Sequence, residues 1–496
     1  MPEEKNVQEL SREIDIRKDK IKRLKEQGVL PYVDKFTRTH TIEEAREVEV
    51  GQKVTICGRM TARRIFGKFG FCSLEDINAK IQVSVGRNEI NEEDYAFYKQ
   101  MIDIGDFIGV TGEIYITETG EKTVRSAEIK LLSKAMLPLP EKFHGLVDLD
   151  QRYRERCMDL VSNKESRTVF LKRCKFMNYL RKFLGENGFL EVETPILQSA
   201  VCGASAKPFF TKHNALNKMC NLRIAPEVYL KQVIAGGFDK VFEVAKCFRN
   251  EGMDPSHLQE FTMVEWYASY WNFEDNIKFF TDFIRGALQE VNGDLKVNYK
   301  GNELDFSKEF ERINYTERVN EILGFNVLDY TDFEEFKKAV LATKLFDKDE
   351  FEACKTIGGI IDTVYKRKIR ENIVQPTVLY NYPACLVPLA RRNDKDERLI
   401  DMFQVLVCGD EICKAYSELV DPIVQREALE DQAKAKAQGD DETMELDEGF
   451  MGAMEQGMPP ISGLGFGIDR LMMILYNQDS IRDVVLFPTM KPVDKK

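Results

Sequence analysis

The sequence predicts an α+β protein in which a small β-barrel precedes a larger domain built on an antiparallel β-sheet flanked by helices. Three observations support this prediction. Five short strand-like segments lie between residues 48 and 134, the proline-marked segment MLPLPEKF follows them, and strand and helix patterns then mix without the βαβα alternation of a parallel sheet. We therefore place an N-terminal helix and barrel at 1–137, a linker at 138–145 and the larger domain at 146–496.

Composition limits the class of protein. The chain has 496 residues, a net charge of −12 and 43% hydrophobic residues, which excludes global disorder and disfavours wholesale coating of nucleic acid. No stretch of about 18 uncharged apolar residues occurs, so no membrane span is expected. The N-terminus also lacks the apolar region of a secretory signal. The 11 cysteines form no C-x-x-C pair, which favours reduced thiols and a cytoplasmic location over a disulfide framework or a zinc site.

Residues 7–26 are predicted to form an amphipathic helix that ends at Gly28. The apolar residues that recur at helical spacing are Leu10, Ile14, Ile21 and Leu24. Within this helix, residues 17–25 carry six basic side chains against one aspartate. This basic segment has two interpretations, a solvated helix face or a strip that contacts phosphates.

The predicted barrel strands are 54–65, 69–76, 80–86, 106–116 and 122–132. Five short strands in so few residues suit an OB-fold, a barrel that commonly binds single-stranded nucleic acid. Cations and aromatic rings alternate in its first hairpin, at Arg59, Arg63, Arg64, Phe66, Lys68, Phe69 and Phe71. The alternative is an ordinary barrel core with exposed arginines.

Three further segments organise the larger domain. Residues 166–188 are predicted to form a helix whose apolar face consists of Phe170, Cys174, Met177, Leu180 and Leu184. The segment FLEVETPIL is predicted to be a strand that ends at Pro195. A charged insertion at 425–450 is predicted to be helical.

Residues 240–267 predict an antiparallel hairpin with a long polar loop. Residues two apart on a strand share a face, which would place Arg249 with Glu251, and Phe261 with Met263, Glu265 and Tyr267. An arginine, the loop residue His257, an aromatic ring and carboxylates on one surface suit a nucleotide together with a cationic ligand. The alternative is a structural Arg249–Glu265 ion pair beneath the hairpin.

Residues 462–475 predict a strand followed by a helix. Gly463, Gly465 and Gly467 leave one strand face without side chains, and Asp469 and Arg470 open the helix. A planar base over the glycines with phosphates on the arginine is a sensible arrangement. No βαβ unit follows, so a dinucleotide-binding fold is disfavoured.

Residues 401–422 predict two strands around Gly409–Asp410. Lys414, Tyr416 and Glu418 would share one face of the second strand. The alternative is a solvated Lys–Glu neighbour pair.

Taken in order, these segments resemble class II aminoacyl-tRNA synthetases, and specifically the lysyl-tRNA synthetase family. FLEVETPIL is similar to the dimer-forming motif 1, FRNEG and its hairpin to motif 2, and GLGFGIDR to motif 3. LRIAPEVYLK, GASAKPF and IRDVVLFPTMKP also match, so the resemblance extends over residues 10–490. It implies an OB-fold anticodon domain, a class II catalytic domain, ATP and Mg²⁺, the substrates lysine and tRNA(Lys), a homodimer formed through motif 1 and a cytoplasmic ligase.

The resemblance also implies residue roles. Arg249, which would bind the α-phosphate and the substrate carboxylate, and Arg470, which would hold the γ-phosphate, are the expected catalytic residues. The ATP site would comprise Arg249, Glu251, His257, Phe261, Glu411 and Arg470. The lysine site would comprise Gly203, Ala204, Glu227, Arg249, Glu265, Tyr267, Lys414, Tyr416 and Glu418. The anticodon would be recognised by Phe71, Gln82 and Glu121.

Three positions depart from the family pattern. Gln404 stands where the family has a metal-binding glutamate, which leaves Glu411 as the charged metal ligand and predicts weaker metal binding. Lys414 stands where the family has an asparagine, and its ammonium would repel the substrate or pair with Glu418. Cys202 replaces a pocket glycine. Two alternatives therefore accompany the ligase hypothesis: a paralogue that binds tRNA or ATP without efficient charging, and a sister synthetase for aspartate or asparagine.

Overall fold

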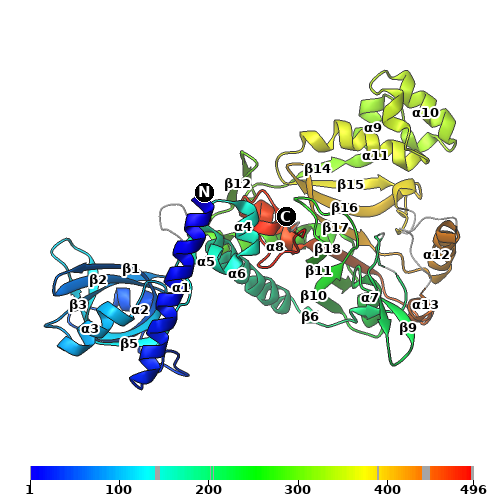
Figure 1. Cartoon of the computed structure of the whole chain (residues 1–496). Helices are drawn as coiled ribbons and strands as arrows, with labels where there is room; N and C mark the ends of the chain where they lie inside the picture. Colours follow the sequence, from blue (N-terminus) through cyan, green and yellow to red (C-terminus); the bar gives the residue numbers. More distant parts are fainter. Residues whose placement is uncertain are drawn as a thin grey trace. The chain divides into compact units, whose positions relative to one another are not determined.

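The computed structural model describes residues 2–139, 146–201, 203–204, 206–387, 390–437 and 447–492 (Figure 1). Its internal contacts divide the chain into two compact units, Met1–Asp148 and Leu149–Lys496. Most of the predicted linker at 138–145 lies outside the described residues, as does Cys202. The first unit contains the predicted barrel and the second contains the antiparallel sheet.

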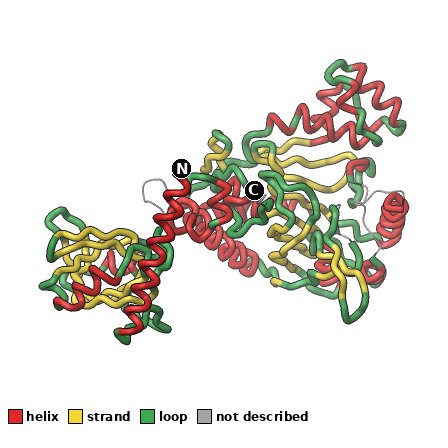
Figure 2. Tube along the Cα trace, viewed as in Figure 1, coloured by secondary structure: helices red, strands yellow, loops and turns green. Residues whose placement is uncertain are grey.

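The first unit is a closed five-stranded barrel, drawn with yellow strands in Figure 2. Its strand order is β1-β2-β3-β5-β4, with β3 and β5 parallel and the other pairs antiparallel. Its strands are β1 Lys53–Phe66, β2 Phe69–Glu75, β3 Lys80–Gly86, β4 Phe107–Ile116 and β5 Lys122–Ser133. Its helices are α1 Pro2–Glu26, α2 Ile42–Glu47 and α3 Glu92–Met101. The five strands and the N-terminal helix confirm the prediction, whereas α2 and α3 were not predicted.

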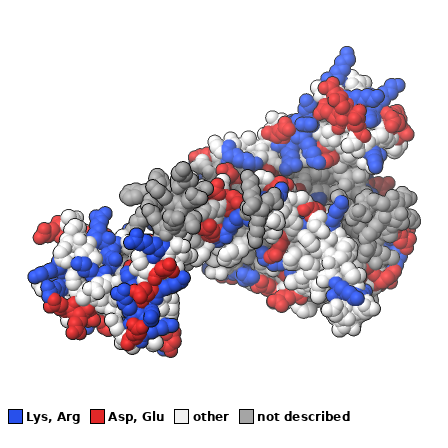
Figure 3. Space-filling model, in the orientation of Figure 1, with Lys and Arg blue, Asp and Glu red and all other residues white. Residues whose placement is uncertain are grey.

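Part of the basic segment of α1, residues 17–25, anchors this helix to the barrel. Arg17 is buried and donates hydrogen bonds to the carbonyl oxygens of Ala135 (3.0 Å) and Ile104 (3.2 Å). Lys20 forms a 2.6 Å ion pair with Asp103. Lysine, arginine and acidic side chains are interspersed over this unit on the face drawn in Figure 3. Only the outward basic residues of α1 therefore remain available to a phosphate.

The second unit is built on an eight-stranded sheet in the order β14-β15-β16-β17-β18-β11-β10-β6. The strands from β15 to β10 are antiparallel, while β14 and β6 add parallel edges. Its strands are β6 Leu190–Glu191, β10 Lys240–Phe248, β11 Glu260–Ser269, β14 Glu311–Asn314, β15 Thr377–Pro383, β16 Leu399–Val407, β17 Asp410–Ser417 and β18 Ile461–Gly467. Smaller sheets contain β7 Leu197–Gln198, β8 Phe210–His213, β9 Lys218–Leu222, β12 Lys296–Tyr299 and β13 Asn302–Asp305.

Helices surround this sheet. They are α4 Leu149–Arg154, α5 Arg156–Ser162, α6 Lys164–Glu186, α7 Glu227–Ala235, α8 Phe273–Asn292, α9 Tyr315–Leu323, α10 Phe333–Ala342, α11 Ile357–Lys368, α12 Pro422–Ala437, α13 Glu448–Glu455 and α14 Ile468–Leu475, with short 3-10 turns at Val327–Asp329, Lys348–Phe351, Arg370–Asn372, Ala384–Leu386 and Ile481–Asp483. The largest apolar core lies between one face of the sheet and α6, α8 and α14. The helices α9 to α11 pack with β15 and β16 in a separate core.

The alternation of side chains along the central strands separates this core from a polar face. On β11, Val264, Trp266 and Ala268 belong to the core, as do Leu464 and Phe466 on β18. The intervening residues point to the opposite face, because successive strand residues project to opposite sides. All of the predicted site positions on β11, β17 and β18 lie on that opposite face.

Two sequence predictions need correction, and a third is confirmed in its described part. FLEVETPIL is strand only at β6 and β7, because β6 pairs with the edge of β10 over two residues and Pro195 cannot donate to a ladder. On α6 the buried face includes Val169 and Phe176, whereas Cys174 is exposed. In the insertion, α12 and α13 confirm helices at its two ends, and residues 438–446 lie outside the described part.

Candidate functional site

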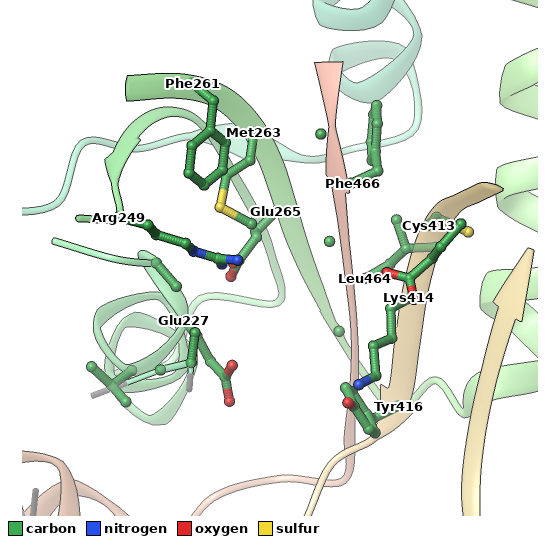
Figure 4. A pocket seen from close by; sticks show the side chains of 18 of the residues that line it. Glu227, Arg249, Phe261, Met263, Glu265, Cys413, Lys414, Tyr416, Leu464 and Phe466 are labelled. Atoms are coloured by element: carbon green, nitrogen blue, oxygen red, sulfur yellow. The ribbon is translucent and has the colours of Figure 1, made fainter. Parts of the chain in front are cut away.

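A cavity of about 620 Å³ opens on the polar face of the sheet. It is lined from β11, β17 and β18, from the loop between β10 and β11, and from the starts of α7 and α14. Figure 4 shows Arg249, Phe261 and Glu265 on one side of β18 and Lys414 with Tyr416 on the other. The structure thus gathers the sequence-predicted residues of all three segments around one space.

The loop after β10 supplies Arg249 and Glu251. Because β10 ends at Phe248, these residues lie beyond the strand, and the strand parity predicted for them is wrong. The Arg249 guanidinium lies over the Phe261 ring at 5.1 Å and donates to the Ile224 carbonyl at 3.4 Å. The alternative prediction of an Arg249–Glu265 ion pair is wrong for the described residues. The buried ion pair at this hairpin joins Arg223 and Glu243 at 2.5 Å.

Arg470 is positioned by its neighbour in the first turn of α14. Asp469 accepts a hydrogen bond from the Thr262 backbone N–H at 2.8 Å and pairs with Arg173 at 2.7 Å, which fixes the start of α14 against β11 and α6. Arg470 then places its Nη2 3.2 Å from His257 Nε2 and its Nη1 3.4 Å from the Glu411 carbonyl oxygen. Two other segments, the loop after β10 and the start of β17, therefore orient the Arg470 guanidinium.

The glycine slot predicted on β18 is filled by protein. A Cβ at Gly463 would lie 2.2 Å from a Tyr267 ring carbon and 2.6 Å from Glu418 Oε1, and a Cβ at Gly465 would lie 3.3 Å from Glu265 Cγ. Because Gly463 and Gly465 have no side chains, Tyr267, Glu418 and Glu265 can pack against the strand there. They occupy the space that was predicted for a base. Only around Gly467 does the face remain open.

Three carboxylates converge at one end of the cavity. Lys231 pairs with Glu227 at 2.6 Å and with Glu418 at 2.7 Å, and Tyr267 donates its hydroxyl to Glu265 at 3.1 Å. Sequence analysis did not single out Lys231. Its spacing of four from Glu227 on a helix was a usable signal, since such residues face one another.

Burial changes the acidity of this cluster. Desolvation, reinforced by the charge of Glu227, raises the pKa of Glu265 to about 8. Desolvation also raises the pKa of Glu418, although Lys231 opposes this effect. The carboxylates around Lys231 keep its pKa above the ordinary value despite its burial. The raised pKa values of Glu265 and Glu418 show that Lys231 does not fully compensate the carboxylates, so a further cation would be stabilised in this cluster.

The small residues Gly203 and Ala204 border the same cavity. Gly203 has a φ of +88°, and a Cβ there would approach the Cβ atoms of Ala225 and Glu227 at 3.4 Å. The left-handed conformation favours glycine at this point. The loop therefore approaches the start of α7 closely enough to close one wall.

Gln404 and Lys414 face each other on neighbouring strands. Gln404 accepts a hydrogen bond from the Tyr382 hydroxyl at 2.6 Å and donates its amide to the Glu411 carboxylate. The Lys414 ammonium lies 5.4 Å from the centre of the Tyr416 ring. The predicted pairing of Lys414 with Glu418 is wrong, because Lys231 holds that carboxylate.

The metal-binding chemistry here differs from a two-carboxylate site. Among the described residues no group of three His, Cys, Asp or Glu side chains is placed to hold a metal. Glu411 offers one carboxylate, and a cation between it and Gln404 would have to displace the amide hydrogen bond. Mg²⁺ that arrives on substrate phosphates can still use a single carboxylate.

The three anticodon candidates lie close together on the outside of the barrel. Phe71 on β2 is opposite Arg64 on one side and Ser84 on the other. Gln82 donates to the Thr123 hydroxyl at 3.3 Å, and that hydroxyl donates to the Glu121 carbonyl at 3.1 Å. Arg63, by contrast, is used internally, since it donates to the carbonyl oxygens of Tyr98 and Ile102.

None of the helices in the described part of the chain is long and apolar enough to cross a membrane. Comparison with known families gives two matches. Residues 148–491 match the family described as tRNA synthetases class II (D, K and N), and residues 54–132 match the OB-fold nucleic acid binding domain. The two matches correspond to the two structural units.

Curated proteins match over the whole chain. The lysine–tRNA ligase of Enterococcus faecalis is 40% identical, covering 98% of this chain and 99% of that protein. The corresponding ligase of Bacillus subtilis is 40% identical over 99% of both chains, and that of Clostridium novyi is 43% identical over 99% of this chain and 96% of its own. With both domains matched and the whole length aligned, the chain belongs to the class II tRNA synthetases, in the family of the lysine–tRNA ligases.

Proposed function

We propose that this chain activates L-lysine with ATP to form lysyl-adenylate and transfers the lysyl group to tRNA(Lys). One observation carries the proposal: a single cavity is lined both by the carboxylates Glu265 and Glu418 and by the cations Arg249 and Arg470. Lysine needs anions for its ε-ammonium, and ATP needs cations for its phosphates. The curated relatives carry the corresponding name, lysine–tRNA ligase.

Lysine would enter with its ammonium toward Glu265, Tyr267 and Glu418, and its α-amino group toward Glu227. Gly203 and Ala204 leave room beside that group, and the ring of Tyr416 borders the aliphatic stem. Phe261 would stack on adenine. Glu251 and His257 would contact the nucleotide, and Arg470 would hold the γ-phosphate.

In the reaction a carboxylate oxygen of lysine attacks the α-phosphorus of ATP. The bond from that phosphorus to the bridging oxygen breaks, pyrophosphate leaves, and the terminal ribose hydroxyl of the tRNA later displaces AMP from the lysyl carbonyl. No protein nucleophile takes part. Arg249 would neutralise both the attacking carboxylate and the α-phosphate, so the rate comes from positioning and charge stabilisation. Mg²⁺ carried by ATP would supply further charge, with Glu411 as its protein carboxylate.

Neither alternative function gains support. A non-charging paralogue has no feature in its favour, since the cavity keeps both its carboxylates and its arginines. Aspartate and asparagine have no cationic side chain for the buried Glu265 and Glu418. The side-chain carboxylate of aspartate would be repelled by Glu265 and Glu418, and the amide of asparagine would leave their charge uncompensated.

We also propose a homodimer, and a cytoplasmic location where tRNA is charged. Exposed apolar side chains gather on β6 to β9 and their flanks, at Leu190, Ile196, Leu197, Phe210, Leu216 and Met219. Apolar patches of this kind are typical of protein interfaces. This region includes the segment similar to motif 1.

Lysine-dependent ATP–pyrophosphate exchange tests the activity directly. The intact chain should exchange with lysine and not with aspartate. Arg470→Ala should reduce exchange on the order of 100-fold or more, because it removes a charge that contacts the phosphates. Arg318→Ala, an exposed arginine on α9, is the control and should match the unaltered chain. Exchange with aspartate alone, or full exchange by Arg470→Ala, would contradict the proposal.

Lysine binding should be linked to release of a proton. The pKa of Glu265 is raised to about 8 in the chain without ligand, so below that pH its carboxyl is protonated and must ionise when the ε-ammonium binds. Affinity for lysine should therefore rise about tenfold per pH unit up to about pH 8 and then level off. Calorimetry in buffers of different ionisation enthalpy measures this release. Glu265→Gln should abolish it and Glu260→Gln on the same strand should not; a pH-independent affinity in the intact chain refutes the linkage.

Phe71→Ala should weaken tRNA binding without altering pyrophosphate exchange. Loss of one stacking ring costs about 1–3 kcal/mol per base, so the KM for tRNA should rise about tenfold or more. Phe66→Ala, an exposed ring on the same barrel, is the comparison and should have a smaller effect. An unchanged KM for tRNA in Phe71→Ala would remove this residue from the anticodon site.

Leu197→Asp should convert the proposed dimer into monomers. Leu197 is 50% exposed, and a carboxylate there would be buried without a partner if two copies meet at this surface. Light scattering of the full chain measures the mass. The exposed Val50→Asp in the barrel unit is the control. A monomeric unaltered chain would rule out the dimer.

A further inference from the structure

Lys414 is a cation inside the cavity that has no carboxylate partner among the described residues. Its Nζ lies beside the Tyr416 ring at 5.4 Å, and its side chain borders both the lysine-binding cavity and a second cavity of about 620 Å³ next to it. Tyr416 and Glu411 keep its pKa raised, at about 12, so it carries a charge at neutral pH. A charge inside a pocket is costly unless it is paired.

Every nearby carboxylate already has another donor. Lys231 holds Glu227 and Glu418, the Tyr267 hydroxyl donates to Glu265, and the Gln404 amide donates to Glu411. Lys231, which is buried, is therefore doubly paired with carboxylates, while the half-buried Lys414 is not. The Lys414 ammonium has Tyr416 beside it but no carboxylate, so its charge is available to an anion that enters the cavity.

The wall around Lys414 is unsuited to a metal ion held by two carboxylates. Gln404, directly opposite Lys414, uses its oxygen to accept from Tyr382 and its nitrogen to donate to Glu411. Compared with the glutamate and asparagine of the family pattern, Gln404 and Lys414 together add two positive charges to this wall. That is the charge of one divalent cation.

We propose that the Lys414 ammonium takes the place of such a cation by contacting the substrate carboxylate and the α-phosphate while the adenylate forms. This inference rests on the proposed function. It makes Lys414 a catalytic residue rather than a neighbour that repels lysine, and it makes the chain less dependent on divalent metal. Arg249 and Lys414 would then approach the reacting groups from opposite sides of β18 (Figure 4).

Metal binding tests the inference without any need for catalysis. Mn²⁺ bound per chain in the presence of ATP is counted by electron paramagnetic resonance. Gln404→Glu alone should bind no more Mn²⁺ than the unaltered chain, because Lys414 would pair with the new carboxylate. Gln404→Glu combined with Lys414→Asn should gain about one ion. An equal gain in the single and double variants, or none in the double variant, would overturn the proposal.

Kinetics provide the second arm. Lys414→Asn should lower the kcat of lysine-dependent exchange about ten- to a hundred-fold and make it more dependent on Mg²⁺. Lys414→Arg should retain most of the activity, and Lys338→Asn, an exposed lysine on α10, should behave like the unaltered chain. A lower KM for lysine with unchanged kcat and unchanged Mg²⁺ dependence would show that Lys414 only repels the substrate. If the unaltered chain shows no lysine-dependent exchange, the proposed function fails, and the Mn²⁺ counts still decide the charge replacement.

Discussion

The alternation of side chains on β11, β17 and β18 is the constraint on which the rest of the catalytic unit depends. One face of these strands carries Trp266, Phe466 and their neighbours into the core against α6, α8 and α14. A shift of one residue in register would bring Glu265 and Lys414 into that core and expose the aromatic rings. Burial of the apolar face therefore fixes the strand register, and the register fixes the positions of the side chains that line the cavity.

Glycines on β18 make this polar face usable. The Tyr267 ring and the Glu418 carboxylate both approach closer to Gly463 than any side chain there would permit. Side chains from the neighbouring strands can consequently meet beside α7. There, Lys231 links the carboxylates of Glu227 and Glu418. Glu265 is buried among these residues, and its burial raises the pKa of its carboxyl to about 8.

Three cations of the cavity, Arg249, Arg470 and Lys414, have no carboxylate partner in the described part of the chain, whereas Lys231 has two. Glu227, Glu265 and Glu418 each have a donor, while Arg249 and Arg470 are held by carbonyl oxygens, by the Phe261 ring and by His257. Such contacts orient a guanidinium without neutralising it, which leaves its charge for a phosphate. Lys414 shares this property, and differs from Lys231 in that respect.

Much of this could be predicted from the sequence. Five barrel strands, the hairpins of β10–β11 and β16–β17, and the strand–helix junction at Arg470 all follow from local apolar periodicity and turn residues. Parity along the strands also placed Glu265 with Tyr267 and Lys414 with Tyr416. These features are local, because a strand of alternating residues has one apolar face whatever it packs against.

Contacts between distant segments were decided only by the tertiary structure. Local pattern does not tell that β10 ends before Arg249, that β18 glycines receive Tyr267 instead of a ligand, or that Lys231 takes Glu418 away from Lys414. Likewise, only packing turned Arg17 from a surface cation into an anchor of the barrel. Each depends on which chemical group is nearest in space. The sequence by itself determined which residues are candidates for binding lysine and ATP. The fold decided which of their charges are paired within the protein, because such pairing depends on three-dimensional distance.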